Sequence, residues 1–251
     1  MSIVCSVGST DPWNAAGLGL DLRVTAELGA TSVWVVAGVT AQDRDGVHAA
    51  AAVAPELVAA QFDALLPADI AAFRVGALLD AATIEVVAAR LGAAAAPVVY
   101  DPVFAPSGGG TFVDAALLRV IRERLLPVVD VVTPNMSEAA ALCERPVVSL
   151  GDMELAAHAL RALGCKAALV KGGHRPSDSI DILADAQGTV YFEDGPRIAG
   201  TLRGTGCLLA AALAASLASG VPLRDAVRVA RAFVREKIAY SRDRAGMRVA
   251  Y

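Results

Sequence analysis

The sequence predicts an α/β fold of three layers, a mainly parallel central sheet with helices on both faces. Strand-like segments alternate with segments of helical periodicity along most of the chain, which is the pattern of parallel βαβ units. Several strand-like segments are continuous apolar runs, as expected where helices cover both faces of a sheet. The 251 residues contain no internal repeat or linker-like stretch, so we expect one domain over residues 1–251.

The first half of the chain follows this alternation. Residues 2–7 and 31–40 are apolar and rich in β-branched side chains, which favours buried strands. The amphipathic segment 17–28 between them is followed by Gly29, a residue type that often terminates helices. The alanine run at 49–52 is interpreted as helix or loop. The same criteria predict helices at 55–66 and 81–91 and strands at 72–78 and 97–103.

A Ser-Gly-Gly-Gly loop at residues 107–110 introduces the second half. Residues 181–185 and 189–193 are expected to form a hairpin about Gly188. An Ala/Leu run at 208–217 has the composition of a buried helix. The remaining pattern predicts strands at 128–132 and 167–171, helices at 114–125, 152–163 and 222–240, and a short helix that opens at Ser137 and Glu138.

The composition excludes several classes of protein. The formal net charge of −4 comes without a basic block, which argues against nucleic acid as a partner. No apolar run approaches the roughly 20 residues of a membrane span, and residues 1–7 lack the basic start of a signal peptide. We therefore expect a cytoplasmic protein with no membrane partner. The cysteines and histidines show neither a CxxC pair nor metal-ligand spacing, so neither a disulfide framework nor a zinc site is indicated.

Six polar residues lie at or just past the ends of predicted strands. In an open α/β sheet, ligands bind outside the carboxyl ends of the strands, so these side chains are expected to converge. Single residues have structural alternatives, since Asp11 can form a turn before Pro12 and Glu138 can be a first-turn helix charge. The six residues are Asp11, Gln42, Asp101, Asn135, Glu138 and Lys171.

A glycine turn precedes the Ala/Leu run. Gly204 and Gly206 flank Thr205, and the free amides at the start of the following helix would attract an anion. The same partial positive charge would lower the thiol pKa of Cys207. The alternative is a hinge with Cys207 as a small buried apolar residue. Together with the strand-end residues, the turn favours phosphoryl transfer, and the absence of GxxxxGK[ST] argues against a P-loop enzyme.

These residues resemble those of the ribokinase-like kinases, and within them the hydroxymethylpyrimidine/phosphomethylpyrimidine kinases of thiamine biosynthesis. The motifs occur in the family's order and spacing over nearly the whole chain. Cys207 indicates this branch, because most sugar kinases of the superfamily carry aspartate there. The matching segments are Gly8-Ser9-Thr10-Asp11-Pro12, Ala16-Gly17, Asp21-Leu22, Thr40-Ala41-Gln42, Asp101-Pro102-Val103, Thr133-Pro134-Asn135, Glu138-Ala139, Lys171-Gly172-Gly173-His174 and Gly204-Thr205-Gly206-Cys207.

The resemblance implies an ATP- and Mg²⁺-dependent kinase, forming a homodimer, that phosphorylates the hydroxymethyl group of 4-amino-5-hydroxymethyl-2-methylpyrimidine. It leaves open whether the monophosphate is also a substrate. It makes Cys207 the acceptor of the substrate proton. The further implied roles are an anion hole of Gly204, Thr205 and Gly206; metal contacts from Glu138 and Asp101; nucleotide contacts from Lys171, Asp101, Thr133, Asn135 and Thr205; and pyrimidine contacts from Asp21, Gln42 and Gly8.

The chain departs from the family pattern beside the expected pocket. Trp13 and Asn14 stand in a usually glycine-rich run, Ala77 replaces a methionine, and Arg203 and Leu208 replace a histidine and a threonine around the Gly-Thr-Gly-Cys turn. Two alternatives therefore stay open. One is a pyridoxal kinase of the same branch, whose substrate also carries a ring-borne hydroxymethyl group, and the other is a pyrimidine-binding protein without catalysis. A structural alternative also stays open for Asp21, which could lie exposed to solvent on the expected first helix without contacting a ligand.

Overall fold

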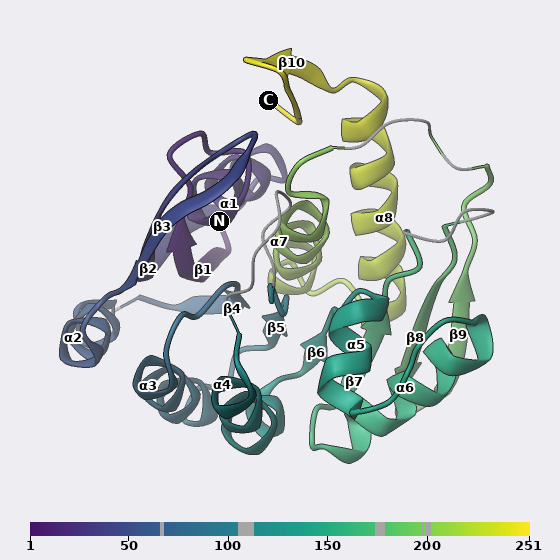
Figure 1. Ribbon diagram of the computed structural model, residues 1–251, viewed down its shortest axis with the longest axis horizontal. Helices are drawn as coiled ribbons and strands as arrows, with labels where there is room; N and C mark the ends of the chain where they lie inside the picture. The colour runs from purple at the N-terminus through teal and green to yellow at the C-terminus, as the bar shows by residue number, and fades with distance from the viewer. Residues whose placement is uncertain (66–67, 105–112, 174–178, 197, 199–201) are drawn as a thin grey trace.

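The computed structural model describes residues 1–65, 68–104, 113–173, 179–196, 198 and 202–251; the predicted loop at 107–110 and His174 lie outside them. Within these residues, a nine-stranded sheet runs through the middle of the molecule and helices lie on both of its faces (Figure 1). The predicted three-layer α/β fold is confirmed.

The sheet has a parallel centre and antiparallel edges. The pairings from β2 through β7 are parallel, so the carboxyl ends of these strands share one edge of the sheet. β3, β8 and β9 pair antiparallel at the two sides. In spatial order the strands are β3 (Gly46–Ala52), β2 (Thr31–Asp43), β1 (Ile3–Thr10), β4 (Ile70–Val75), β5 (Val98–Tyr100), β6 (Val131–Val132), β7 (Ala167–Val170), β8 (Asp181–Asp185) and β9 (Gly188–Phe192).

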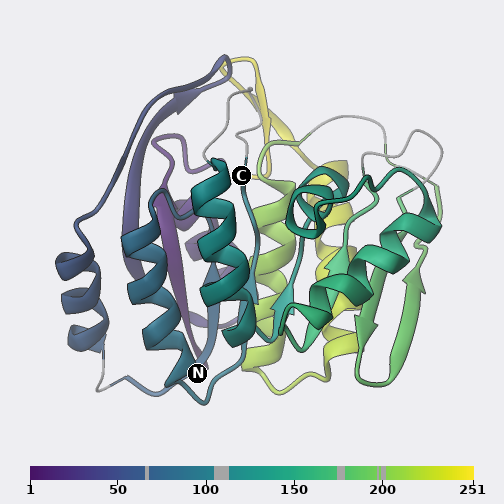
Figure 2. The ribbon, with the colours of Figure 1, turned by 60° about the horizontal axis from the view of Figure 1, so that its bottom comes forward.

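Two groups of helices cover the sheet, one on each face (Figure 2). An apolar cluster of buried side chains lies between each group and the strands. One face carries α1 (Gly17–Glu27), α7 (Thr205–Ala218) and α8 (Leu223–Ala239), and the other carries α2 (Pro55–Leu65), α3 (Ala81–Gly92), α4 (Ala115–Val120), α5 (Met136–Cys143) and α6 (Leu150–Ala162). α4 continues into a π-helical turn, Ile121–Leu125, and a 3₁₀ turn, Leu126–Val128.

The helix predicted from the Ala/Leu run is α7. It packs against α1, α8 and the central strands, and its residues from Cys207 to Ser216 are all buried. An Ala/Leu helix that is apolar on every side suits this position, because it meets protein on all sides. Its packing places the first turn of α7, with Thr205, at the carboxyl edge of the parallel strands.

Two structural elements differ from the sequence-based expectation. The alanine run at 49–52 belongs to β3, which pairs with an extended β2, so its interpretation as helix or loop is wrong. A C-terminal hairpin of β10 (Arg242–Arg244) and β11 (Met247–Val249) was not predicted either. Both errors concern strands that form through their pairing partner, because alanine and aspartate have little strand propensity of their own.

Within the part of the chain that the structure describes, no helix combines the length and apolar character needed to span a membrane. The assignment of residues 1–251 to one domain stays a prediction.

Candidate active site

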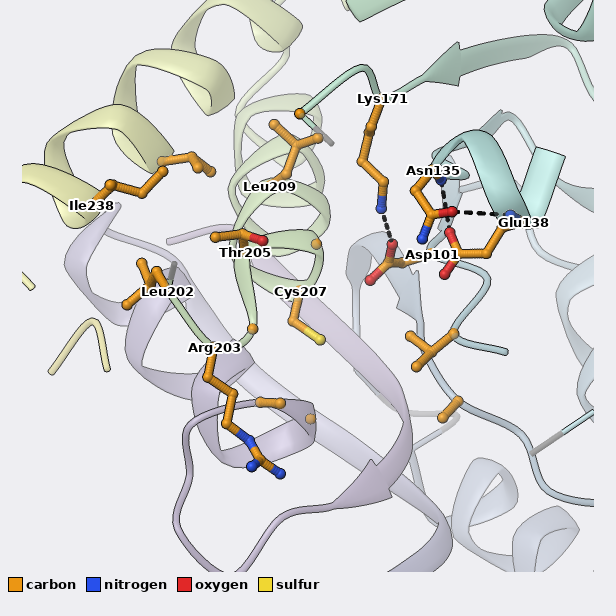
Figure 3. A pocket seen from close by; sticks show the side chains of 18 of the residues that line it. Asp101, Asn135, Glu138, Lys171, Leu202, Arg203, Thr205, Cys207, Leu209 and Ile238 are labelled. Carbon is orange, nitrogen blue, oxygen red and sulfur yellow. Dashed lines mark hydrogen bonds and ion pairs between the residues drawn. The ribbon is translucent and has the colours of Figure 1, made fainter. Parts of the chain in front are cut away.

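A cavity of about 580 Å³ lies at the shared carboxyl edge of the parallel strands (Figure 3). Most of the predicted site residues converge on it from strand ends and from the first turn of α7. Four predicted residues lie outside its lining: Gly8 packs against Gly76, while Asp11, Asp21 and Thr133 are buried. The predicted residues that line the cavity are Gln42, Asp101, Asn135, Glu138, Lys171, Gly204, Thr205, Gly206 and Cys207.

The glycine turn requires its glycines for different reasons. Gly204 has φ +79°, and a Cβ there would lie 2.2 Å from the carbonyl oxygen of Ala15. A Cβ on Gly206 would instead come within 3.1 Å of Lys171 Nζ and 3.3 Å of the Asp101 carboxylate oxygens. The first turn of α7 therefore faces this charged pair closely. No side chain in the described ranges caps the helix, which leaves its first amides available to an anion.

Asp101 is held between two cations at the end of β5. Lys171 Nζ lies 2.8 Å from Oδ1, and Arg74 Nη2 lies 3.2 Å from Oδ2. Thr133 Oγ1 donates to Oδ1 over 3.3 Å. Burial raises the pKa of Asp101, but Lys171 and Arg74 outweigh it and hold this pKa below its usual range. Asp101 is therefore an ionised carboxylate on the cavity wall.

Asn135 and Glu138 form a reciprocal capping box at the start of α5. The Glu138 amide donates to Asn135 Oδ1 over 2.9 Å, and the Asn135 amide donates to Glu138 Oε2 over 2.7 Å. The cap positions both side chains on the cavity wall, as Figure 3 shows. Burial raises the pKa of Glu138 to about 7, with Asp101 acting in the same direction and Lys171 against it.

Arg74 is a site residue that the sequence analysis missed. It lies on β4 with a side chain 1% exposed, and it reaches both Asp101 and Asp21, whose Oδ2 lies 3.1 Å from Arg74 Nη1. Burial raises the pKa of Asp21 to about 6, against the effect of Arg74. The alternative of an exposed Asp21 is wrong. The sequence did contain a signal for Arg74, because it is a charged residue inside an apolar strand that is expected to be covered on both faces.

Cys207 lines the cavity from the first turn of α7, with 8% of the residue exposed. Burial raises the pKa of its thiol, and the opposing effects of Arg74 and the Gly17 amide are smaller. The predicted lowering of this pKa is therefore wrong for the ligand-free protein. The helix terminus is present as expected, but burial removes water from the thiolate, and this destabilises the thiolate more than Arg74 and the nearby amide stabilise it.

Gln42 and Arg203 also line the cavity and contact each other. Arg203 Nη2 donates to Gln42 Oε1 over 2.7 Å, and Nη1 donates to the carbonyl oxygen of Asp43. Arg203 Nε lies 3.9 Å from Oδ2 of the buried Asp11. Trp13 is 42% exposed and lies outside the cavity lining, so it does not fill the expected substrate space.

The described residues contain no group of three or more His, Cys, Asp or Glu side chains that could hold a metal ion by itself. Carboxylates nevertheless occur singly on the cavity wall, together with a lysine and free helix amides. This combination suits an anionic ligand that supplies metal-binding oxygens of its own.

A sequence model of the family described as phosphomethylpyrimidine kinase matches residues 11–249, nearly the whole chain. The chain belongs to the phosphomethylpyrimidine kinase family. This membership confirms the recognised resemblance and the predicted enzyme class, a phosphotransferase with an alcohol acceptor.

Similarity to individual proteins supports the same family membership. Over 234 residues the chain is 36% identical to the hydroxymethylpyrimidine/phosphomethylpyrimidine kinase of Streptomyces coelicolor, covering 92% of this chain and 87% of the relative. It is also 36% identical over 247 residues to the chloroplastic thiamine biosynthetic bifunctional enzyme TH1 of Arabidopsis thaliana, covering 96% of this chain but 47% of that protein. The chain therefore spans about half the length of this second relative.

Among solved structures, the pyridoxal kinase from Staphylococcus aureus in complex with pyridoxal superposes with a TM-score of 0.89 at 26% identity, covering 99% of this chain and 92% of that one. The likeness extends over the whole sheet and both helical layers and confirms the ribokinase-like fold.

Proposed function

We propose that the chain is an ATP- and Mg²⁺-dependent kinase of the hydroxymethyl group of 4-amino-5-hydroxymethyl-2-methylpyrimidine in thiamine biosynthesis. The observation that carries this proposal is the convergence of Cys207, the uncapped first turn of α7 and the Lys171–Asp101 pair on one cavity. The named function of the Streptomyces relative supports the choice of substrate.

The reaction follows from these positions. Cys207, as a thiolate, takes the proton of the substrate hydroxyl group, and the freed oxygen forms a bond to the γ-phosphorus of ATP. The bond from that phosphorus to the bridging β–γ oxygen breaks, and ADP leaves with the electron pair. The α7 amides and the Lys171 ammonium stabilise the negative charge on the transferring group. Thr133 and Thr205 remain proposed nucleotide contacts, and Gly8 and Asp21 proposed supports of the substrate side.

The carboxylates of Asp101 and Glu138 fit the way proteins hold Mg²⁺ in phosphoryl transfer, with one or two carboxylates while phosphate oxygens and waters complete the shell. Asn135 supports this pair by fixing Glu138 through the capping box. When bound there, the ion neutralises charge on the phosphates. Lys171, which already contacts Asp101, would shift its contact towards the phosphates as a point charge.

The test compares purified protein on three acceptors with Mg-ATP: the pyrimidine alcohol, its monophosphate and pyridoxal. We expect turnover of the pyrimidine alcohol to exceed that of pyridoxal, and the monophosphate assay decides whether a second phosphorylation occurs. Pyridoxal is a specific second candidate because the superposed Staphylococcus structure holds that ligand. A large preference for pyridoxal would overturn the choice of substrate.

Calorimetry separates catalysis from binding alone. Heat of pyrimidine binding without ADP release in the presence of Mg-ATP would favour a non-catalytic pyrimidine-binding protein over the kinase. The cytoplasmic location and the homodimer stay predictions, and gel filtration with light scattering tests the second of them.

A further inference from the structure

Arg203 ties together four segments that are far apart in the sequence. Its side chain donates to Gln42 and Asp43 at the end of β2, lies 3.6 Å from the sulfur of Met247 in the C-terminal hairpin, and faces Asp11 after β1. The Arg203 amide also donates to the β11 backbone over 3.1 Å. With its side chain only 9% exposed, the guanidinium is largely committed to these partners.

The charge of Arg203 is balanced inside the protein. Asp11 is 3% exposed and accepts hydrogen bonds from the backbone amides of Trp13 and Ala16, 3.0 Å away in each case, so its carboxylate is fixed in place. At 3.9 Å from Asp11, Arg203 has a carboxylate counter-ion before any ligand binds. A guanidinium that is compensated in this way is suited to holding neighbouring groups and poorly suited to binding a substrate phosphate.

The contact with Gln42 also fixes the direction of its amide. Arginine carries donors only, so the side-chain oxygen of Gln42 must face Arg203. The NH₂ group then points away from Arg203, and within the described residues it makes no hydrogen bond. The β2–β3 pairing is irregular between Ala41 and Gln42, as at bulges that redirect a side chain. Gln42 lines the cavity, so its NH₂ group is the part available to a ligand.

We infer that Arg203 is a positioning residue that determines specificity: it holds Gln42 so that the amide NH₂ donates to an unprotonated ring nitrogen of the acceptor substrate. The inference rests on the proposed function, because it assigns the face of the pyrimidine that Gln42 recognises. The recognised group is thus a heteroaromatic hydrogen-bond acceptor, while the exocyclic amino group contributes less.

Two variants separate the two halves of this arrangement. Arg203→Met removes the donors and keeps an apolar chain of similar length, whereas Gln42→Glu keeps an oxygen for Arg203 and removes the NH₂ donor. Each is expected to raise KM for the pyrimidine by roughly 5- to 100-fold, the range for one lost hydrogen bond to a buried polar group. KM for ATP should stay unchanged. Arg203→Lys, which still offers donors to Gln42, should restore most of the loss.

Substrate analogues test the direction of the bond. Two aminopyridine analogues each replace one ring nitrogen of the pyrimidine by CH, and a third analogue keeps both ring nitrogens but lacks the exocyclic amino group. The wild type should bind one of the two aminopyridines more weakly than it binds the analogue without the amino group. In Gln42→Glu this ranking should reverse, because a carboxylate accepts from the amino group. Arg228→Met is the matched control, since Arg228 is 57% exposed and pairs with Asp225 on α8. Circular dichroism and thermal unfolding verify the fold of each variant.

The inference is overturned if folded Arg203→Met binds the pyrimidine as tightly as the wild type, or if Lys and Met at position 203 cause equal losses, which would assign Arg203 only a structural role. The inference would also be overturned if the wild type lost more affinity on removal of the exocyclic amino group than on replacement of either ring nitrogen. Calorimetry of the wild type with the pyrimidine alone separates the two proposals. Absence of binding would defeat the proposed function as well, whereas binding that is equal in all variants would defeat only the role of Arg203.

Discussion

Arg74 and Asp21 form an ion pair inside the protein, with Nη1 3.1 Å from Oδ2 and side chains that are 1% and 0% exposed. Neither Asp21 oxygen accepts a hydrogen bond of good geometry, and Arg74 Nε is also without a partner in the described residues. The pair is therefore held mainly by charge. Because Arg74 also contacts Asp101, one buried guanidinium joins helix α1 to the carboxylate at the end of β5.

Arg74→Met should lower the free energy of unfolding by about 3–5 kcal/mol, since it leaves the buried carboxylate of Asp21 without its cation and removes one of the two cations beside Asp101. Urea unfolding measures this change. Arg90→Met is the matched control, because Arg90 pairs with Asp63 on the surface and such pairs contribute only about 0–1 kcal/mol. Equal losses in the two variants would contradict the importance of the buried pair.

The protonation of Asp21 should make stability depend on pH. Its pKa is raised from 3.8 to about 6, so between these pH values native Asp21 keeps a proton that the unfolded chain releases. This carboxyl group therefore lowers the free energy of unfolding as pH rises through that window, by on the order of 3 kcal/mol. Asp21→Asn should remove this decline. Parallel pH curves for the wild type and the variant would contradict the raised pKa.

Cys207→Ser should still bind both ligands but lose about 10²- to 10⁴-fold in kcat, the usual contribution of a general base. Because burial raises the thiol pKa, kcat of the wild type should rise with pH into the alkaline range beyond an ordinary cysteine. Steady-state kinetics across pH measure both effects. Cys143→Ser is the control, since that half-buried thiol donates to Ala156 away from the cavity. An unchanged kcat would remove Cys207 from the mechanism.

Glu138→Gln should retain the fold and raise the Mg²⁺ concentration needed for half-maximal turnover. Glutamine can take the place of glutamate in a capping box, so α5 keeps its start while a metal-binding carboxylate is lost. A Mg²⁺ titration of the kinase reaction measures the shift. Asp152→Asn alters the second capping box, formed with Ser149 at the start of α6, and should leave this titration unchanged. An unshifted Mg²⁺ dependence in folded Glu138→Gln would exclude Glu138 from the metal site.

Much of the site could be predicted because its residues occupy strand ends. Asp101, Asn135 and Lys171 follow apolar strands, and parallel pairing brings those ends to one edge whatever the details of packing. Asp21 was expected at the substrate, but its depth depends on how α1 packs on the sheet, and this packing buries it with Arg74.

The sequence by itself determined the alternation of parallel strands and helices along the chain, the family, and the glycine turn that begins α7. These follow from local properties, namely apolar periodicity and a positive φ that only glycine adopts easily. The tertiary structure decided that the alanine run is strand β3, that Cys207 is a thiol of raised pKa, and that Arg74 and Arg203 hold Asp21 and Gln42. Each of these features depends on residues that are far apart in the chain, because such residues either remove water from a side chain or provide its partner.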